Sequence, residues 1–274
     1  MPGKLGIIAG GGNLPLRVIE AAQAAGREVF VLGVQGQAEP AVLQAAPSIV
    51  LPIGAARRFL RELRQRGIEE VVLAGKVTRP TLREIKLDWV AAKVIAKATF
   101  RALGDDGLIR SVIKVIEAEG PRVVAPQEIL QDLKAPEGVL GRHAPDARAR
   151  ADIARGFKVA RQLGLVDVGQ SVVVQQGIVL GVEAIEGTDE LLRRCAGLRR
   201  STGGGVLVKM CKPQQDRRGD PPVIGPATLH EAAAAGLHGV AVEAGGVLVV
   251  DQREAVEIAD AKGLFLVGVR PDGG

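Results

Sequence analysis

The fold of this chain is most constrained by its first motif. In this motif a short apolar segment leads into a glycine turn, and a helix follows. Residues 5–9 are apolar, residues 10–13 read Gly-Gly-Gly-Asn, and helical periodicity follows over 14–25. Glycines let backbone amides approach a ligand closely, and a helix N-terminus favours an anion. The sequence predicts a phosphate-holding turn, and a plain tight strand–helix turn remains the alternative. Its candidate binding residues are Gly11, Gly12 and Asn13.

The turn lacks the marks of two common nucleotide-binding motifs. It does not read G-x-G-x-x-G, and no Lys-Ser/Thr pair follows as in a P-loop. The second predicted strand ends in Val34-Gln35-Gly36, without the acidic residue that holds a nicotinamide ribose. A redox dinucleotide is therefore disfavoured, and a nucleotide or sugar phosphate stays open.

Strands and helices alternate up to residue 131, which predicts a parallel sheet with right-handed crossovers. The expected strands are 5–9, 28–32, 70–74 and 122–125, and the expected helices are 14–25, 55–66, 88–102 and 106–119. Ligands of such sheets lie at the carboxyl ends of the strands. We predict an α/β fold whose residues 1–131 form a Rossmann-like, nucleotide- or phosphate-binding domain.

The second half has a different pattern. Residues 132–148 are rich in Pro, Gly and charges, which predicts a linker. Residues 149–274 predict a catalytic, mixed α/β domain with β-hairpins at 171–184 and 239–250, and the ligand is expected in the interdomain cleft. The two hairpin-plus-helix segments are loosely alike, so an internal duplication is a second interpretation.

Composition narrows the class of protein. The chain has 274 residues, of which 47% are hydrophobic and 24% charged, as in a globular two-domain enzyme. Aromatics make up 2%, which disfavours stacking of nucleic-acid bases, so no nucleic-acid partner is predicted. The net charge of +5 suits an anionic ligand or an acidic membrane surface. The sequence shows neither a signal peptide nor a membrane span, and we expect a cytoplasmic protein.

Two loops after predicted elements of the first domain carry candidate ligand-binding groups. The candidate residues of the first loop are Gly75, Lys76, Thr78 and Arg79. They would offer cations and a hydroxyl to a phosphate, although surface cations in loops are common. Asp105 precedes the helix predicted over 106–119, where it either caps the helix or contacts Mg²⁺.

The second domain has two further candidate segments. Gly187 and Thr188 begin a predicted helix, where they serve as a cap or as a phosphate site. Residues 209–228 concentrate cations and carboxylates in a proline-containing loop, as metal-assisted attack on a phosphoryl group requires. The candidate substrate-binding residues there are Lys209, Lys212 and Arg217, and the candidate catalytic residues are Asp216 and Asp220. A salt-bridged surface loop is the alternative.

The order and spacing of these motifs resemble the LpxI-type UDP-2,3-diacylglucosamine pyrophosphatases of lipid A biosynthesis. The resemblance rests on residues 8–15, 74–80, 104–106, 182–189 and 212–228. It implies Mg²⁺-dependent attack of water on the α-phosphorus, which yields 2,3-diacylglucosamine 1-phosphate (lipid X) and UMP. It also implies a homodimer, with transient contact at the inner face of the inner membrane.

The resemblance assigns site residues as well. The family's essential aspartate matches Asp220, which with Asp105 is the predicted metal-binding pair. Gly219 departs from the pattern, since an apolar residue is expected before that aspartate. Two other functions remain: a non-catalytic regulator that binds a nucleotide sugar, and a nucleotidyl- or glycosyltransferase that uses an acceptor other than water.

Overall fold

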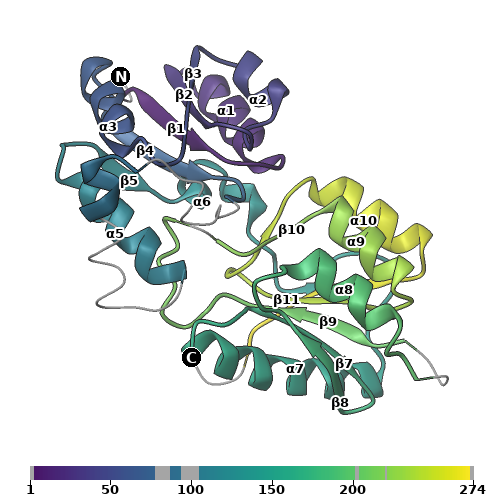
Figure 1. Cartoon of the computed structure of the whole chain (residues 1–274). Helices are drawn as coiled ribbons and strands as arrows, with labels where there is room; N and C mark the ends of the chain where they lie inside the picture. The colour runs from purple at the N-terminus through teal and green to yellow at the C-terminus, as the bar shows by residue number, and fades with distance from the viewer. Residues whose placement is uncertain (1–2, 78–86, 94–104, 201–203, 220, 272–274) are drawn as a thin grey trace. The chain divides into compact units, whose positions relative to one another are not determined.

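The computed structural model describes residues 3–77, 87–93, 105–200, 204–219 and 221–271 (Figure 1), without the side chains of Asp105, Asp106 and Gln131. The chain forms two compact units. The first unit comprises residues 1–131 together with the short segment 216–220. The second unit comprises residues 132–215 and 221–274. The chain therefore returns to the first unit after most of the second has been built.

The first unit has a five-stranded parallel sheet in the order β3-β2-β1-β4-β5. The strands are β1 (Leu5–Ala9), β2 (Val29–Val34), β3 (Ser48–Leu51), β4 (Glu70–Ala74) and β5 (Arg122–Val124). The helices are α1 (Leu14–Ala24), α2 (Pro40–Gln44), α3 (Ala56–Gln65), α5 (Asp105–Glu117) and α6 (Pro126–Ile129). β1 lies at the centre, with β2 on one side and β4 on the other. The strand order reverses there, which is where ligands of open parallel sheets bind.

Apolar periodicity explains how these elements pack. Leu5 and Ile7 of β1 and every residue of β2 are buried, as expected for strands covered on both faces. On α3, Phe59, Leu60 and Leu63 face the sheet and share one core with Ile113 of α5. Helix and strand periods thus place one apolar stripe against another.

The second unit has a mixed six-stranded sheet in the order β6-β13-β11-β9-β7-β8. Its strands are β6 (Gly138–Val139), β7 (Ser171–Gln175), β8 (Ile178–Val182), β9 (Val206–Lys209), β11 (Gly239–Glu243) and β13 (Phe265–Val269). β9, β11 and β13 are parallel, whereas β6 and β7 run antiparallel to their neighbours. β10 (Val223–Ile224) and β12 (Leu248–Val249) form a separate two-stranded parallel sheet.

Helices cover both faces of this six-stranded sheet. α7 (Ala147–Leu165) packs on one face, where Phe157 meets Val172 and Val208. α8 (Thr188–Ala196), α9 (Pro226–Ala234) and α10 (Gln252–Ala261) share the core of the other face, which includes Val173 and Leu207. Figure 1 shows α7 alone on its side of the sheet. Neighbouring strand residues point to opposite faces, so the unit has two cores.

The α/β class with a parallel sheet and a mixed sheet is confirmed. The hairpin at 171–184 is also confirmed, since β7 and β8 pair around Gln176 and Gly177, both at positive φ. The second predicted hairpin is wrong, because β11 pairs with β9 and β13 while β12 pairs with β10. The buried run 239–243 is a central parallel strand, which its continuous apolar character fits. β3 and α2 were missed, and β4 is the fourth strand of the chain.

The segment predicted as a linker, 132–148, lies in the second unit. β6 pairs with β13, and the amide of Arg142 donates to Asp260 at 2.7 Å. The prediction of one domain over 149–274 also differs from the structure, since 216–220 falls in the first unit. Among the described residues, no helix has the length and apolar character needed to cross a bilayer.

Candidate functional site

The reversal of strand order in the first sheet brings the predicted glycine turn beside the loop after β4. The amide of Gly10 donates to Ala74 O at 2.8 Å, and Gly11 and Lys76 exchange backbone hydrogen bonds of 2.8 and 3.0 Å. The two loops are therefore tied together by backbone contacts. The structure brings together the predicted residues Gly11, Gly12, Asn13, Gly75 and Lys76 at one sheet edge.

Glycine is required where these loops touch. A Cβ on Gly10 would lie 2.5 Å from Lys76 O, and one on Gly75 would lie 2.6 Å from Gly11 O. Gly75 also has φ +88°, a region that L side chains rarely adopt. Part of the glycine pattern thus serves the approach of two backbones.

The same contacts change what the turn can offer a ligand. The Gly11 amide is already bonded to Lys76 O. Gly12 has φ +86°, and Asn13 is the N-cap residue of α1, although its side chain makes no capping hydrogen bond. The first amides of a helix have no partner within it, so an anion would meet α1 at its N-terminus. Thr78 and Arg79 lie outside the described residues.

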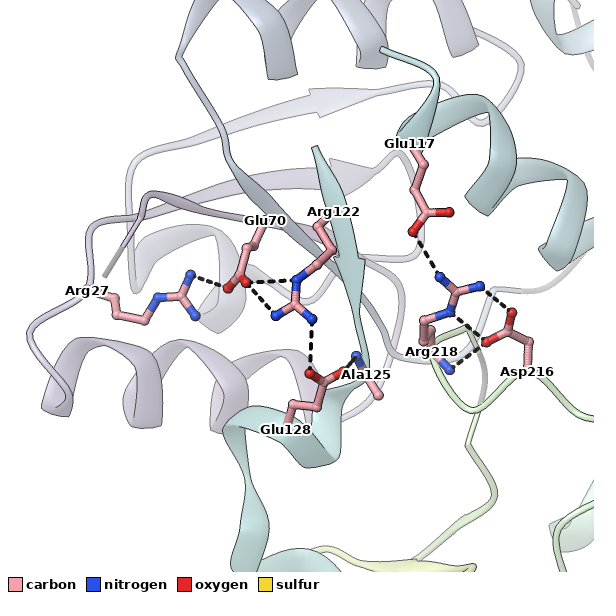
Figure 2. Close-up of polar contacts among 8 residues, drawn as sticks. All are labelled: Arg27, Glu70, Glu117, Arg122, Ala125, Glu128, Asp216 and Arg218. Atoms are coloured by element: carbon pink, nitrogen blue, oxygen red, sulfur yellow. Dashed lines mark hydrogen bonds and ion pairs between the residues drawn. The ribbon is translucent and has the colours of Figure 1, made fainter. Parts of the chain in front are cut away.

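The segment 216–220 contributes a carboxylate and a cation to the first unit, as Figure 2 shows. Asp216 Oδ1 accepts from the backbone amide and Nε of Arg218 at 3.1 and 3.0 Å, and Oδ2 accepts from Nη2 at 2.8 Å. The Arg218 hydrogen bond lowers the pKa of Asp216 below its ordinary value, with burial opposing it. A carboxylate held in this way is a weak base, so the geometry favours a role for Asp216 in holding the loop.

Two further contacts attach the segment to the first unit. Arg218 Nη1 donates to Glu117 Oε1 of α5 at 2.8 Å, and Gln127 Nε2 donates to Arg217 O at 3.3 Å. The Arg217 side chain, a predicted ligand contact, is exposed. The segment is therefore fixed both at a side chain and at its backbone.

The structure explains why the chain has glycine at position 219, where the family resemblance leads us to expect an apolar residue. A Cβ at this position would lie 2.0 Å from Cγ2 of Ile109 on α5. The apolar residue expected there does not fit, because α5 lies too close. Asp220, the next residue, lies outside the described residues.

Figure 2 also shows an ion network at the start of β4. Glu70 accepts from Arg27 at 2.7 Å and from Arg122 at 2.6 Å, and Arg122 also reaches Glu128. Burial raises the pKa of Glu70, but the two arginines outweigh it and the pKa is lowered. The network lies at the amino ends of β4 and β5, opposite the edge that carries the glycine turn, and it ties these strands to α6.

A buried polar cluster lies at the sheet edge of the second unit. Lys209 Nζ at the end of β9 donates to Thr188 Oγ1 at 2.8 Å, and the Thr188 hydroxyl donates to Glu183 Oε1 at 2.8 Å. Ser171 Oγ lies 3.3 Å from Thr188 Oγ1. All four side chains are at most 9% exposed. A lysine and a carboxylate thus share one hydroxyl inside the unit, and we call these four residues the buried polar cluster.

The charges of this cluster compensate each other. Burial raises the pKa of Glu183, yet the charge of Lys209 and hydrogen bonds from Thr188, Ser171 and Gln170 lower it below its ordinary value. A buried charge is tolerated only when it is paired and hydrogen-bonded. Glu183 is therefore ionised at neutral pH and fixes both Thr188 and Lys209.

The backbone before α8 completes this edge. Gly187 is the N-cap residue at φ +82°, and Thr188 is the first residue of the helix. The predicted phosphate site therefore consists of a helix N-terminus beside the ammonium group of Lys209. The structure brings Gly187, Thr188 and Lys209 together.

Lys212 does not join this group. Its Nζ donates to Asp167 Oδ1 at 2.5 Å, and the two side chains are 11% and 17% exposed. The Cys211 amide donates to Glu243 Oε2 at 2.8 Å, which holds the chain after β9. In this geometry, the ion pair of Lys212 with Asp167 holds the conformation of the loop after β9.

The predicted Mg²⁺ site falls largely outside the described residues. Asp105 is the first residue of α5, but neither its side chain nor Asp220 is described. Within the described ranges, no three His, Cys, Asp or Glu side chains are grouped to hold a metal ion. Carboxylates are the oxygen ligands that Mg²⁺ takes, so the types of these two residues fit the ion.

Two models of protein families match this chain. The model described as "LpxI N-terminal domain" matches residues 4–133, and the one described as "LpxI C-terminal domain" matches residues 136–267. A relative from Caulobacter vibrioides (strain ATCC 19089 / CIP 103742 / CB 15), named "UDP-2,3-diacylglucosamine pyrophosphatase LpxI", is 41% identical over 275 residues. The match covers 98% of each chain. The chain belongs to the LpxI family.

Solved structures give weaker similarities. The biotin carboxylase subunit of a pyruvate carboxylase aligns at TM-score 0.30 and 9% identity, over 63% of this chain and 35% of that one. The biotin carboxylase domain of the Hydrogenobacter thermophilus 2-oxoglutarate carboxylase aligns at TM-score 0.29 and 11% identity, over 72% and 41%. TM-scores this low carry no argument about function.

The sequence did not mark several residues of these sites in this chain. Ser171 and Glu183 flank the β7–β8 hairpin, where polar residues at strand ends are ordinary. Glu117 lies far from Arg218 in the sequence, and nothing local marks it. The usable signal was a Ser and a Glu at the ends of otherwise apolar strands, which predicts a polar edge to the sheet.

Proposed function

We propose that this LpxI family member hydrolyses the pyrophosphate bond of UDP-2,3-diacylglucosamine, which releases lipid X and UMP in lipid A biosynthesis. The observation that carries the proposal is the 41% identity, over 98% of both chains, to a relative named for that pyrophosphatase. The oxygen of water forms a bond to the α-phosphorus, and the bond from that phosphorus to the bridging oxygen breaks. The bridging oxygen leaves with lipid X, and the water protons are released.

The second unit supplies groups suited to the substrate's phosphates. The ammonium group of Lys209 has three donors, and among the described residues Thr188 accepts from one of them. The α8 N-terminus beside it adds backbone amides and a favourable dipole. Such donors stabilise the charge that develops on a phosphoryl group under attack.

Asp220 and Asp105 are the residues that we assign to Mg²⁺. The ion would neutralise charge on phosphoryl oxygens when it is bound. Asp216 holds Arg218 and thereby the backbone that leads to Asp220. Of the two aspartates first assigned to catalysis, Asp220 therefore keeps the role of metal ligand or water-orienting group, and Asp216 has a positioning role.

The test is hydrolysis of purified substrate by wild type and by Asp220→Ala. Loss of about 10³-fold in kcat fits removal of a metal or water-orienting group. Asp132→Ala is the matched control, because Asp132 is exposed and belongs to none of the proposed binding groups. Near wild-type turnover by Asp220→Ala would remove the role given to Asp220.

The same assay separates the alternatives. A regulator that only binds nucleotide sugars would bind the substrate and release neither product. A transferase would require an added acceptor, and in ¹⁸O-labelled water its products would carry no label. Label in UMP supports attack at the α-phosphorus, whereas label in lipid X contradicts it.

We also propose a cytoplasmic homodimer that meets the membrane transiently. Light scattering on the purified full chain tests the assembly. A monomer mass at all concentrations would contradict the homodimer.

A further inference from the structure

The exposed surface of α7 carries five cations. Arg148, Arg150, Arg155, Lys158 and Arg161 are all exposed. Their spacing places Arg148, Arg155 and Lys158 on the side of the helix opposite Ile153 and Phe157, which pack on the sheet, whereas Arg150 and Arg161 flank that apolar stripe. The helix is thus amphipathic, with a cationic outer face.

The acidic residue within α7 does not lie on this face. Among the residues of α7, the acidic side chain is Asp152, which is 4% exposed and accepts from the amides of Gln176 and Gly177. Within the described ranges, Arg155 and Lys158 form no ion pair. Arg155 and Lys158 are therefore available to an external anion.

Exposed apolar side chains lie at the C-terminal end of the same helix. Leu165, Val166 and Val168 are 53%, 69% and 46% exposed, and Ile185 is fully exposed. The chain at Gly169 runs directly beside residue 183, since Gln170 N donates to Glu183 Oε2 and Glu183 N donates to Ser171 O. We call these four side chains the apolar tip. It adjoins the loop that leads to Thr188 and the buried polar cluster.

α3 offers an internal comparison. It is also rich in arginine, but Arg64 pairs with Glu119, and Arg66 pairs with Glu62 and stacks on Phe30. Its apolar residues Phe59, Leu60 and Leu63 are buried. α7 thus combines exposed cations with exposed apolar side chains at its end, and α3 does not.

We propose that the α7 outer face and the apolar tip dock the second unit on an anionic phospholipid bilayer. A basic amphipathic helix binds such a surface through charge, and apolar side chains at its end enter the headgroup region. The proposal deepens the proposed function, because it names the surface at which an enzyme with a diacylated substrate meets the membrane. Docking there would bring the α8 N-terminus close to the lipid surface.

The composition of the surface favours lipid over nucleic acid. Proteins that bind single strands use aromatic side chains for stacking, and the α7 outer face and apolar tip contain none. Aliphatic side chains beside cations suit the boundary between headgroups and acyl chains. Duplex DNA is nonetheless included in the test as the competing polyanion.

The experiment measures co-sedimentation of the full-length protein with vesicles at low salt. The vesicles are phosphatidylcholine alone or an equimolar mixture with phosphatidylglycerol. The test variant is Arg155→Glu/Lys158→Glu, and the matched control is Arg58→Glu/Arg61→Glu on α3, which changes the net charge equally. Each cation near an anionic membrane surface raises the partition coefficient of a protein about fivefold. We therefore expect the partition coefficient on anionic vesicles to fall at least about 25-fold for the α7 variant only.

A second pair of variants tests the apolar tip. Val166→Ser/Ile185→Ser should weaken binding at high salt as well as at low salt, because the apolar contact is not screened. Leu198→Ser is the control, since Leu198 is exposed and lies outside the apolar tip. Far-UV circular dichroism and thermal melting check that each variant is folded.

Three results would overturn the proposal. They are absence of binding to the anionic vesicles, equal loss in the α7 and α3 variants, and α7-dependent binding to duplex DNA without binding to vesicles. Sedimentation needs no turnover, so docking and hydrolysis can fail separately. Substrate in detergent micelles should be hydrolysed equally by wild type and by the α7 variant, whereas substrate in anionic vesicles should be hydrolysed more slowly by the variant.

Discussion

Glu183 shows how one buried carboxylate can organise a binding edge. It accepts from Thr188, and Thr188 accepts from Lys209, so a single acid sets the orientation of a hydroxyl and an ammonium group. Removing one member of a buried charged pair leaves the other without compensation. Glu183 contacts no ligand in the proposed function, but it sets the positions of Thr188 and Lys209, which we place at the ligand.

Glu183→Gln should reduce the free energy of unfolding by about 3 kcal/mol at neutral pH, since a buried lysine loses its counter-charge. The lowered pKa of Glu183 means that its contribution is present above the ordinary carboxyl value of about 4.3 and is lost as the pH falls through the lower, folded-state pKa. The difference between wild type and variant should shrink on acidification. Urea titrations from neutral to acidic pH measure it.

Glu190→Gln is the control for this series, because Glu190 is exposed and pairs with Arg193 at the surface. Its effect should stay within about 1 kcal/mol at every pH. A gap between wild type and Glu183→Gln that widens below pH 4 would contradict the assigned direction of the pKa.

Gly219→Ala should slow turnover, because its Cβ would meet Cγ2 of Ile109 and displace the residue that precedes Asp220. A misplacement of about 1 Å at a reacting group can cost about 10²-fold in rate. Ile109→Ala removes the clashing methyl group, so the double variant should recover part of the loss. Steady-state kinetics of both single variants and the double variant measure the coupling, and no recovery would contradict this account.

At this scale, local sequence patterns predicted which side chains lie at the edge of a sheet. The sequence selected Thr188 and Lys209 from their place before a helix and after a strand, which local patterns reveal. It did not reveal the ion pair of Lys212 with Asp167, 45 residues away. Such pairings depend on the assembled sheet, so local composition does not reveal them.

At the scale of elements, two loops joined by backbone hydrogen bonds lie at the carboxyl edge of the first sheet, where we predict the ligand. Gly75→Ala should cost at least about 2 kcal/mol of unfolding free energy, because it combines a positive φ with a contact of 2.6 Å to Gly11 O. Gly67→Ala has a positive φ and no neighbour within 4 Å, so about 1 kcal/mol is expected. Thermal and urea melts compare the two, and equal losses would show that the contact is harmless.

The sequence predicted most elements but only one of the two hairpins. Gln176-Gly177 gives a two-residue turn between apolar strands, which is a strong local signal. Ala244-Gly245-Gly246 gives a similar signal, yet the strands on either side pair with other partners. β3 was missed because it is short and its first three residues are partly or fully exposed. Strand partners depend on distant segments, which a turn signal does not specify.

At the scale of the whole molecule, the first unit is discontinuous in the sequence. Replacing residues 216–220 by Gly and Ser should loosen α5, because Glu117 loses Arg218 and Ile109 loses its contact with Gly219. Hydrogen exchange in the full chain should accelerate at the amides of α5, whereas β9 and β11 stay protected. Unchanged exchange at α5 would show that the segment adds nothing to the first unit.

The discontinuity has a consequence for synthesis on the ribosome. Translation completes the five strands of the first sheet early, but residues 216–220 emerge only after much of the second unit. At roughly 5–20 residues per second, the nascent first unit waits on the order of seconds for its last segment. During that interval the apolar surface of α5 that later receives Gly219 is open to chaperones. A codon change or a mutation that delays the second unit would therefore lower the yield of a correctly formed first unit.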